Sequence, residues 1–283
     1  MRYPSLVLAV VVLMSATSVF DGHTLAQAGA ADTLHKPLDS ILDVDVRDGY
    51  VYYRALRSDR ARLDRYVASL NVPAATYQGW SREQQMAFWV NAYNAFVLET
   101  VIDHYPIKGS SKEYPVNSVR QVPGAFEQIK HRAAGQNLTL DEIEKKILPP
   151  FKEPRLYLAL GRGAVGSGRL RSEAFTGELL KQQLDSVQKE FTSEQTMIRV
   201  DRGASQISVT PIISWHDAEF IAAYDPGATG TMAQRSPVER AIVAFVTPHL
   251  LPLEKEFLQK NEFKVTDHPL DWRLNDLTGG APK

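Results

Sequence analysis

The sequence predicts an α+β fold that is mainly helical and carries a small antiparallel sheet. Several segments open with helix-capping residue pairs and continue with apolar residues at helical spacing. Strand-like segments are few and short, and they do not alternate regularly with helices, which excludes a doubly wound α/β sheet. The 283 residues are 44% hydrophobic and 23% charged, as in ordinary globular proteins. We expect one domain over residues 46–283, preceded by an N-terminal linker over residues 29–45.

The first 28 residues are typical of a secretory signal peptide. Arg2 precedes an apolar run from Leu6 to Met14, and the small-residue triplet Ala26-Gln27-Ala28 follows. Nine residues span only about 14 Å as a helix, which is far less than a bilayer core of about 30 Å. The alternatives are a cut nearer Ser18 and a buried N-terminal helix. We expect a soluble protein that is secreted or periplasmic and has no membrane span once mature.

Three capping boxes predict the starts of helices. They are Ser81 with Gln84, Thr139 with Glu142, and Ser236 with Glu239. The helix after Ser81 is apolar on nearly all sides, so we expect it to be central and to end near His104, before Pro106. The helix after Thr139 is expected to stop at Pro149-Pro150, and the helix after Ser236 to reach about Val246.

Apolar periodicity predicts two more helices. One carries a stripe from Leu56 to Leu70, and the other begins at a Thr176 cap and runs through Phe191. Strands are predicted at Leu156–Leu160, between a proline and a glycine, and in a hairpin formed by Met197–Val200 and Ile207–Val209. The stretch from Ala222 to Gln234 is rich in glycine, alanine, threonine and proline, and predicts a long loop.

Charge and composition exclude several classes of function. The formal net charge is −1, which does not provide the basic face of a nucleic-acid-binding domain. The chain has no cysteine, so disulfides, thiolate catalysis and sulfur-ligated metals are excluded. Its seven histidines form no H-x-x-x-H pair. We therefore predict no metal, no cofactor and no nucleic-acid partner.

The most unusual segment is residues 161–171, which we call the Gly/Arg loop: four glycines and three arginines in eleven residues. Three of its glycines match the dinucleotide pattern G-x-G-x-x-G, but no helix opens directly after them, as a Rossmann unit requires. Backbone amides flanked by guanidinium groups suit a carboxylate or a phosphate. The alternative is a surface turn whose arginines pair with nearby acids. The predicted ligand-binding residues in the loop are Arg162, Gly163, Gly166, Gly168, Arg169 and Arg171.

Several blocks of sequence resemble domain-of-unknown-function family 547. The blocks are Ala87–Ala95, Leu138–Glu144, Pro154–Leu160, Trp215–Phe220 and Asp271–Asn275, in this order. The resemblance extends from about Val51 to Asn275. It implies a fold similar to papain-like or transglutaminase-like enzymes, and acyl-transfer chemistry in at least some members. The family has no assured activity.

The departures from the family pattern affect the predicted chemistry. The family usually has cysteines where this chain has Ser167 and Arg162, and commonly histidines where it has Lys145 and Tyr157. A serine needs a base within about 3 Å to act as a nucleophile at neutral pH. The candidates are His216 and Lys145, so the predicted catalytic set is Ser167, His216 and Lys145. Alternatively, His216 belongs to a charged helix start and Lys145 lies on a solvated helix face.

Two asparagines on the central helix are also candidate ligand-binding residues. Asn91 and Asn94 are three residues apart and share a helix face. A buried amide without a partner costs about 1–3 kcal/mol, so these side chains either tie down a crossing backbone or face a polar cleft. Tethering is the favoured interpretation. The aromatic residues Trp89, Tyr93 and Trp215 are predicted to lie in the core.

Three functional hypotheses follow. The leading one is an exported binding protein, derived from an acyl-transfer-like fold without a thiol, that holds an anionic small molecule or peptide through the Gly/Arg loop. The second is a serine-dependent hydrolase or acyltransferase that uses Ser167. The third is a structural or protein-interaction domain without a ligand.

Overall fold

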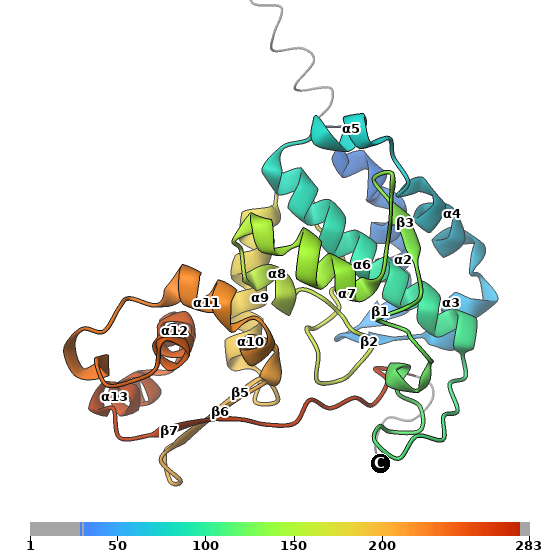
Figure 1. Cartoon of the computed structure of the whole chain (residues 1–283). Coiled ribbons are helices and arrows are strands. Elements are labelled where there is room, and N and C mark those ends of the chain that lie inside the picture. Colours follow the sequence, from blue (N-terminus) through green and yellow to red (C-terminus); the bar gives the residue numbers. More distant parts are fainter. Residues whose placement is uncertain (1–28, 30, 278–283) are drawn as a thin grey trace, which may run out of the picture.

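The computed structural model of the protein describes residue 29 and residues 31–277 (Figure 1). The predicted signal peptide, residues 1–28, lies outside this part of the chain. Within it, no helix combines the length and the apolar character needed to cross a bilayer. Helices dominate and the sheets are small and mostly antiparallel, which confirms the predicted α+β class.

Helix α6 (Arg82–His104) is the centre of the fold, as predicted (Figure 1). Ser81 caps it by accepting a hydrogen bond from the backbone of Gln84, whose side chain in turn accepts one from the backbone of Ser81. The helix ends before Pro106, because the residue preceding a proline is driven out of helical geometry. Most of its side chains are buried on all sides, which explains the lack of a polar face in its sequence.

The N-terminal helices pack against one side of α6. The segment expected to be a linker, residues 29–45, contains a ten-residue helix with Leu38, Ile41 and Leu42 in the core, at the spacing that places them on one face. The stripe from Leu56 to Leu70, predicted as one helix, is divided into two by a turn. These elements are α2 (Lys36–Asp45), β1 (Val46–Arg47), β2 (Tyr50–Val51), α3 (Tyr53–Ser58), α4 (Ala61–Ser69) and α5 (Ala74–Gln78).

The middle of the chain covers the other side of α6. The capping box of Thr139 and Glu142 is present as predicted. The prediction of a strand at Leu156–Leu160 is wrong, because these residues begin as a short helix after Pro154; a brief apolar run cannot distinguish a strand from a buried helix. Thr176 accepts a hydrogen bond from the Leu179 amide, but the helix starts only at Leu180. The elements are η1 (Val119–Gln121), β3 (His131–Ala133), β4 (Gln136–Leu138), α7 (Leu140–Glu142), η2 (Ile143–Ile147), η3 (Pro149–Phe151), α8 (Arg155–Leu158) and α9 (Leu180–Ser193).

The C-terminal third forms a lobe beside α9 (Figure 1). The predicted hairpin pairs β5 with β6, and β7 adds to β6 in parallel. The predicted long loop is shorter at its start, because a helix extends to Tyr224, and it holds one short 3₁₀ turn. The elements are β5 (Ile198–Asp201), β6 (Gln206–Val209), α10 (Pro211–Trp215), α11 (Asp217–Tyr224), η4 (Gly230–Met232), α12 (Pro237–Val246), η5 (Thr247–His249), α13 (Pro252–Lys260) and β7 (Lys264–Asp267).

A C-terminal strap, residues 271–277, returns from this lobe to the N-terminal half. Its backbone accepts hydrogen bonds from Val165 (2.9 Å) and Gly166 (2.9 Å) of the Gly/Arg loop. It also pairs with Val51 through two further backbone hydrogen bonds. The strap thus fixes the Gly/Arg loop between β2 and the C-terminal lobe.

Candidate functional site

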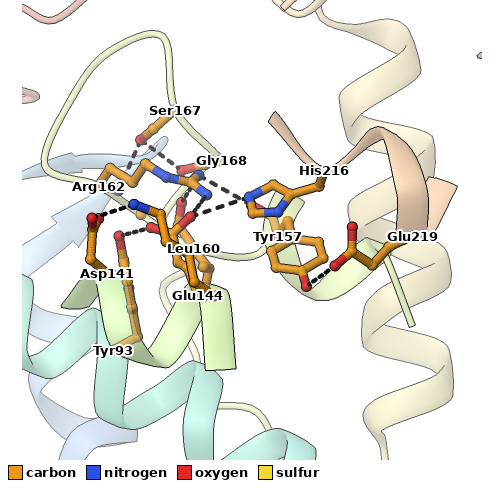
Figure 2. A network of polar contacts seen from close by, with 12 residues as sticks. Tyr93, Asp141, Glu144, Tyr157, Leu160, Arg162, Ser167, Gly168, His216 and Glu219 are labelled. Atoms are coloured by element: carbon orange, nitrogen blue, oxygen red, sulfur yellow. Dashed lines mark hydrogen bonds and ion pairs between the residues drawn. The ribbon is translucent and has the colours of Figure 1, made fainter. Parts of the chain in front are cut away.

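The polar centre of the molecule is the carboxylate of Glu144, which is 7% exposed (Figure 2). Glu144 lies in η2, directly after the capped turn of α7. Its Oε2 accepts a hydrogen bond from Arg162 Nη2 at 2.6 Å and lies 3.3 Å from His216 Nε2. Its Oε1 accepts a hydrogen bond from the Tyr93 hydroxyl on α6. Four separate segments of the chain therefore meet at one buried carboxylate.

This network keeps its two central charges ionised despite burial. Burial by itself raises the pKa of Glu144, but the charge of Arg162 and the hydrogen bonds from His216, Arg162 and Tyr93 outweigh it and lower the pKa to about 2. Burial also disfavours the charge of Arg162, which by itself would lower the pKa of the guanidinium. The nearby Glu144 carboxylate outweighs this effect and raises that pKa. Arg162 also donates to the carbonyl oxygens of Tyr157 and Leu160. The pair is a salt bridge with nearly all of its hydrogen-bonding capacity satisfied.

His216 lies between this buried network and a solvent-accessible cavity. Its ring stacks on that of Tyr157, with centroids 3.6 Å apart and planes at 8°, and the residue is 9% exposed. Nε2 faces the ionised Glu144 and therefore carries the proton, since a carboxylate can only accept. Nδ1 has no hydrogen-bond partner among the described residues and is not sealed from solvent. The imidazole thus has an oriented ring and a free lone pair.

His216 lines a cavity of about 440 Å³ between the start of α11, the α7–η2 segment and the Gly/Arg loop. Its wall holds two stacked indoles, Trp215 and Trp272, with centroids 6.3 Å apart. Trp215 is 45% exposed, so the prediction that it belongs to the core is wrong; it forms the wall of the cavity instead. The lining residues are Arg120, Phe126, Asp141, Glu144, Lys145, Pro149, Arg162, Trp215, His216, Glu219 and Trp272.

Two further cations open onto the same cavity. Lys145 is largely exposed and pairs with Asp141 one helical turn earlier. The Arg120 guanidinium carbon lies 4.3 Å from the centre of the Phe126 ring and 4.8 Å from that of Trp272. Arg120 pairs through Nη1 with the exposed Glu127, while its Nε has no hydrogen-bond partner in the part of the chain described. The site therefore combines aromatic walls with two cations, Lys145 and Arg120, which pair with the half-buried Asp141 and the exposed Glu127.

Ser167 lies apart from the predicted bases. It is 2% exposed, and its Oγ accepts a hydrogen bond from the Arg162 amide at 3.1 Å and donates to the Ala164 carbonyl at 2.8 Å. It lines a second cavity, of about 250 Å³, on the side of the loop that faces α9. Of the predicted catalytic residues, the structure brings His216 and Lys145 to one cavity and places Ser167 at another.

The other two arginines of the Gly/Arg loop pair with acids outside this cavity. Arg169 pairs with Asp48 at 3.2 Å and with Glu190 at 3.8 Å, and Arg171 pairs with Glu173 at 2.8 Å and with Glu190 at 3.0 Å. The glycines allow close packing: a Cβ at Gly168 would lie 2.0 Å from a backbone oxygen, one at Gly166 would lie 2.4 Å from a backbone nitrogen, and Gly163 has a φ of +68°. Of the six loop residues predicted to bind a ligand, only Arg162 lines the cavity of about 440 Å³ that contains His216.

Asn91 and Asn94 tether crossing backbone, as the favoured interpretation predicted. Asn91 forms two hydrogen bonds with the backbone of Phe175, at 2.7 and 2.9 Å. Asn94 donates to the carbonyl of Ala159 at 3.2 Å and accepts from the amide of Gly161 at 2.8 Å. Both asparagines are buried, and the second one fixes the first residue of the Gly/Arg loop.

Three residues of the site were not predicted from the sequence: Glu144, Arg120 and Trp272. Glu144 stands among charged neighbours on a short helix, where a solvated face is the usual outcome. The one available signal was its place two residues after the capping box, which turns it away from the exposed Lys145 and toward α6. Arg120 carries no local motif, and Trp272 lies in the Asp271–Asn275 block, which points to the family but to no role for this residue. Among the described residues, no group of three histidine, aspartate or glutamate side chains could hold a metal ion.

Comparison with known proteins relates the central part of the chain to a family. No curated protein and no solved structure gave a significant match. The family model described as "Protein of unknown function, DUF547" matches residues 77–192, which include α6, Glu144 and the whole Gly/Arg loop. The match confirms the predicted resemblance over residues 77–192, and the absence of cysteine fits an atypical member. The blocks Trp215–Phe220 and Asp271–Asn275 lie outside the matched residues. Residues 77–192 are therefore similar to the DUF547 family of proteins of unknown function.

Proposed function

We propose that this protein is an exported, non-thiol binding protein with an acyl-transfer-like fold, and that it captures a carboxylate-bearing small molecule or peptide in the cavity lined by Trp215, Trp272 and Arg120. The observation that carries the proposal is the Arg120 guanidinium, which lies over the Phe126 and Trp272 rings beside the cavity and forms its ion pair with the exposed Glu127. Its Nη groups can exchange this solvated partner for the carboxylate of a ligand.

The basic groups of the cavity differ in how firmly they are held. Arg162 is committed to Glu144 inside the protein. Lys145 and Arg120 pair with Asp141 and the exposed Glu127 in more solvated positions, where an ion pair contributes about 0–1 kcal/mol. A ligand carboxylate can replace such weak partners, and a guanidinium can bind it with two hydrogen bonds. The carboxylate of the ligand is therefore assigned to Arg120, and Lys145 is a second cation on the same cavity, while Arg162 stays paired with Glu144.

The aromatic wall supplies the apolar part of the binding energy. Trp215 exposes almost half of its surface although it stacks on Trp272. Cavities of several hundred Å³ with aromatic walls and a few polar groups are typical of small-molecule sites. A ligand with a flat apolar body and a carboxylate would cover the exposed indole and reach the basic groups.

A pair of probes that differ only in charge tests this proposal. We expect N-acetyl-L-phenylalanine to bind at least tenfold more tightly than its neutral amide, N-acetyl-L-phenylalaninamide, in isothermal titration calorimetry. A charge-assisted hydrogen bond contributes about 1.5–3 kcal/mol, and about 1.4 kcal/mol corresponds to a factor of ten in affinity. The Arg120→Gln variant should lose this preference for the acid.

Arg169→Gln is the matched control. It also removes one positive charge, but Arg169 does not line the cavity of Trp215, Trp272 and Arg120. It should keep the full preference. Equal binding of the acid and the amide to the wild-type protein, or no binding of either at millimolar concentration, would refute capture of a carboxylate. Thermal unfolding of both variants verifies that they remain folded.

A further inference from the structure

We infer that His216 acts as a general base which activates a water molecule to hydrolyse an ester bond in the captured ligand. The inference rests on the proposed function, because the substrate occupies the same cavity. It extends that function from binding to turnover, and it does not use Ser167. The reasons lie in the surroundings of the imidazole, in the side chains that line the cavity and in the position of the neighbouring cations.

The surroundings of His216 hold one nitrogen ready to accept a proton. The ring is fixed from its face by Tyr157 and from its Nε2 edge by Glu144. Glu144 is ionised, and Arg162 and Tyr93 fix it in turn. In the tautomer that donates from Nε2 to Glu144, the lone pair is on Nδ1, which has no partner among the described residues in a side chain that is about nine-tenths buried. A carboxylate behind an imidazole also stabilises the imidazolium that forms when Nδ1 takes a proton.

The lining of the cavity points to water as the nucleophile. No serine or threonine is among its lining residues, and the chain has no cysteine. Ser167, the hydroxyl nearest in sequence to Arg162, is hydrogen-bonded to the loop backbone and opens on the other cavity. A general base in a cavity that is lined by no serine, threonine or cysteine can deprotonate a bound water, because water needs only one proton acceptor within hydrogen-bond reach.

The reaction has two steps. In the first, His216 Nδ1 removes a proton from water while the water oxygen bonds to the acyl carbon, and the electron pair of the C=O bond moves onto its oxygen. In the second, the electron pair returns, the bond to the leaving alcohol oxygen breaks, and that oxygen takes the proton from Nδ1. The products are a carboxylic acid and an alcohol, and the imidazole is neutral again. Lys145 lines the same cavity and is the ammonium donor available for the developing negative charge.

A carboxylate-bearing chromogenic ester tests the inference. The probe is mono-4-nitrophenyl terephthalate, whose rigid ring keeps its own carboxylate away from the ester. We expect nitrophenolate release by the wild-type protein, and a loss of at least a hundredfold in kcat with little change in KM for His216→Gln, since a general base contributes about 10²- to 10⁴-fold. Glutamine retains an N–H that can donate to Glu144.

Two controls separate this route from others. Ser167→Ala should keep the rate, whereas a serine-dependent route would lose it. His249→Gln replaces an exposed histidine outside the cavity and should also keep the rate, which excludes hydrolysis by surface imidazoles. In this scheme Glu144 is a positioning residue. Glu144→Gln removes the negative charge that faces the His216 imidazolium. The midpoint of the profile of hydrolysis rate against pH should therefore move to lower pH. Loss of stability alone would not produce such a shift.

A separate binding measurement distinguishes the two proposals. Terephthalamic acid, the unreactive amide analogue of the probe, should bind to both the wild-type protein and His216→Gln. If it binds and the ester is not turned over faster than in buffer, hydrolysis by His216 is refuted and ligand capture stands. If neither the analogue nor the ester binds, capture in this cavity fails as well. Equal turnover by the wild-type protein and His216→Gln would also overturn the inference.

Discussion

Replacing Arg162 by methionine should destabilise the protein strongly at neutral pH and much less in acid. The substitution keeps most of the side-chain length but removes the charge that holds Glu144 at 2.6 Å. Breaking a buried ion pair from one side costs about 3–5 kcal/mol, because the remaining charge stays buried without compensation. Tyr93 and His216 still donate to the carboxylate, so we expect the lower half of that range.

The lowered pKa of Glu144, to which Arg162, His216 and Tyr93 all contribute, sets the pH range over which the ionised carboxylate stabilises the fold. A fall from 4.5 to about 2 corresponds to roughly 3 kcal/mol of stability. Because the folded-state pKa is lowered, this contribution is complete above about pH 4.5 and is lost as the pH falls toward 2. In Arg162→Met the charge that lowers the pKa is gone and burial raises it, so the stability difference between wild type and variant should shrink over this interval.

Urea unfolding followed by tryptophan fluorescence at pH 7, 5 and 3 measures the difference directly. The double variant Glu144→Gln, Arg162→Met is the control, because removing both partners leaves no uncompensated charge and should cost less than Arg162→Met alone. A loss below about 1 kcal/mol at pH 7, or a difference that stays constant from pH 7 to pH 3, would refute the assignment of a buried, ionised pair.

Two further substitutions test how the Gly/Arg loop is held. Asn94→Ala leaves buried backbone groups unpaired, so it should lower the free energy of unfolding in urea by about 1–3 kcal/mol. The control Asn137→Ala, on an exposed strand, should lower it by less than about 0.5 kcal/mol. Equal losses of stability in the two variants would contradict the role of Asn94 as a tether. Gly168→Ala places a Cβ 2.0 Å from the Leu158 carbonyl oxygen and should lower the melting temperature by several degrees. In the control Gly203→Ala the nearest atom to the new Cβ is 3.5 Å away, so the melting temperature should hardly change. A Gly168→Ala protein as stable as the wild type would show that the Gly/Arg loop can accommodate a side chain at this position.

Local chemistry made much of the fold predictable. The capping box at Ser81 is an interaction over three residues, so its partners are visible in the sequence and recur in the structure. The same holds for Thr139 and Ser236. Asn91 and Asn94 were predicted as tethers because a buried amide must find a partner wherever it lies. The run after Pro154 was predicted wrongly, because helix and strand look alike over five apolar residues.

The candidate site was less predictable because it is assembled from distant segments. Glu144 and Arg162 are 18 residues apart, and His216 is 72 residues from Glu144, so no spacing rule joins them. Trp215 was expected in the core since large aromatic residues usually are, and only tertiary structure shows that it stands at the wall of a cavity. His216 and Lys145 were named as candidates, but their convergence at one cavity and the separation of Ser167 depend on how the Gly/Arg loop folds back.

The C-terminal strap has a consequence for synthesis on the ribosome. Val165 and Gly166 obtain hydrogen-bond acceptors from residues that are translated about a hundred positions later. Until residues 271–277 emerge from the exit tunnel, those amides have only water as a partner, and the arginines beside them lack a fixed frame. The Gly/Arg loop can therefore obtain its final backbone hydrogen bonds only after residues 271–277 have been translated.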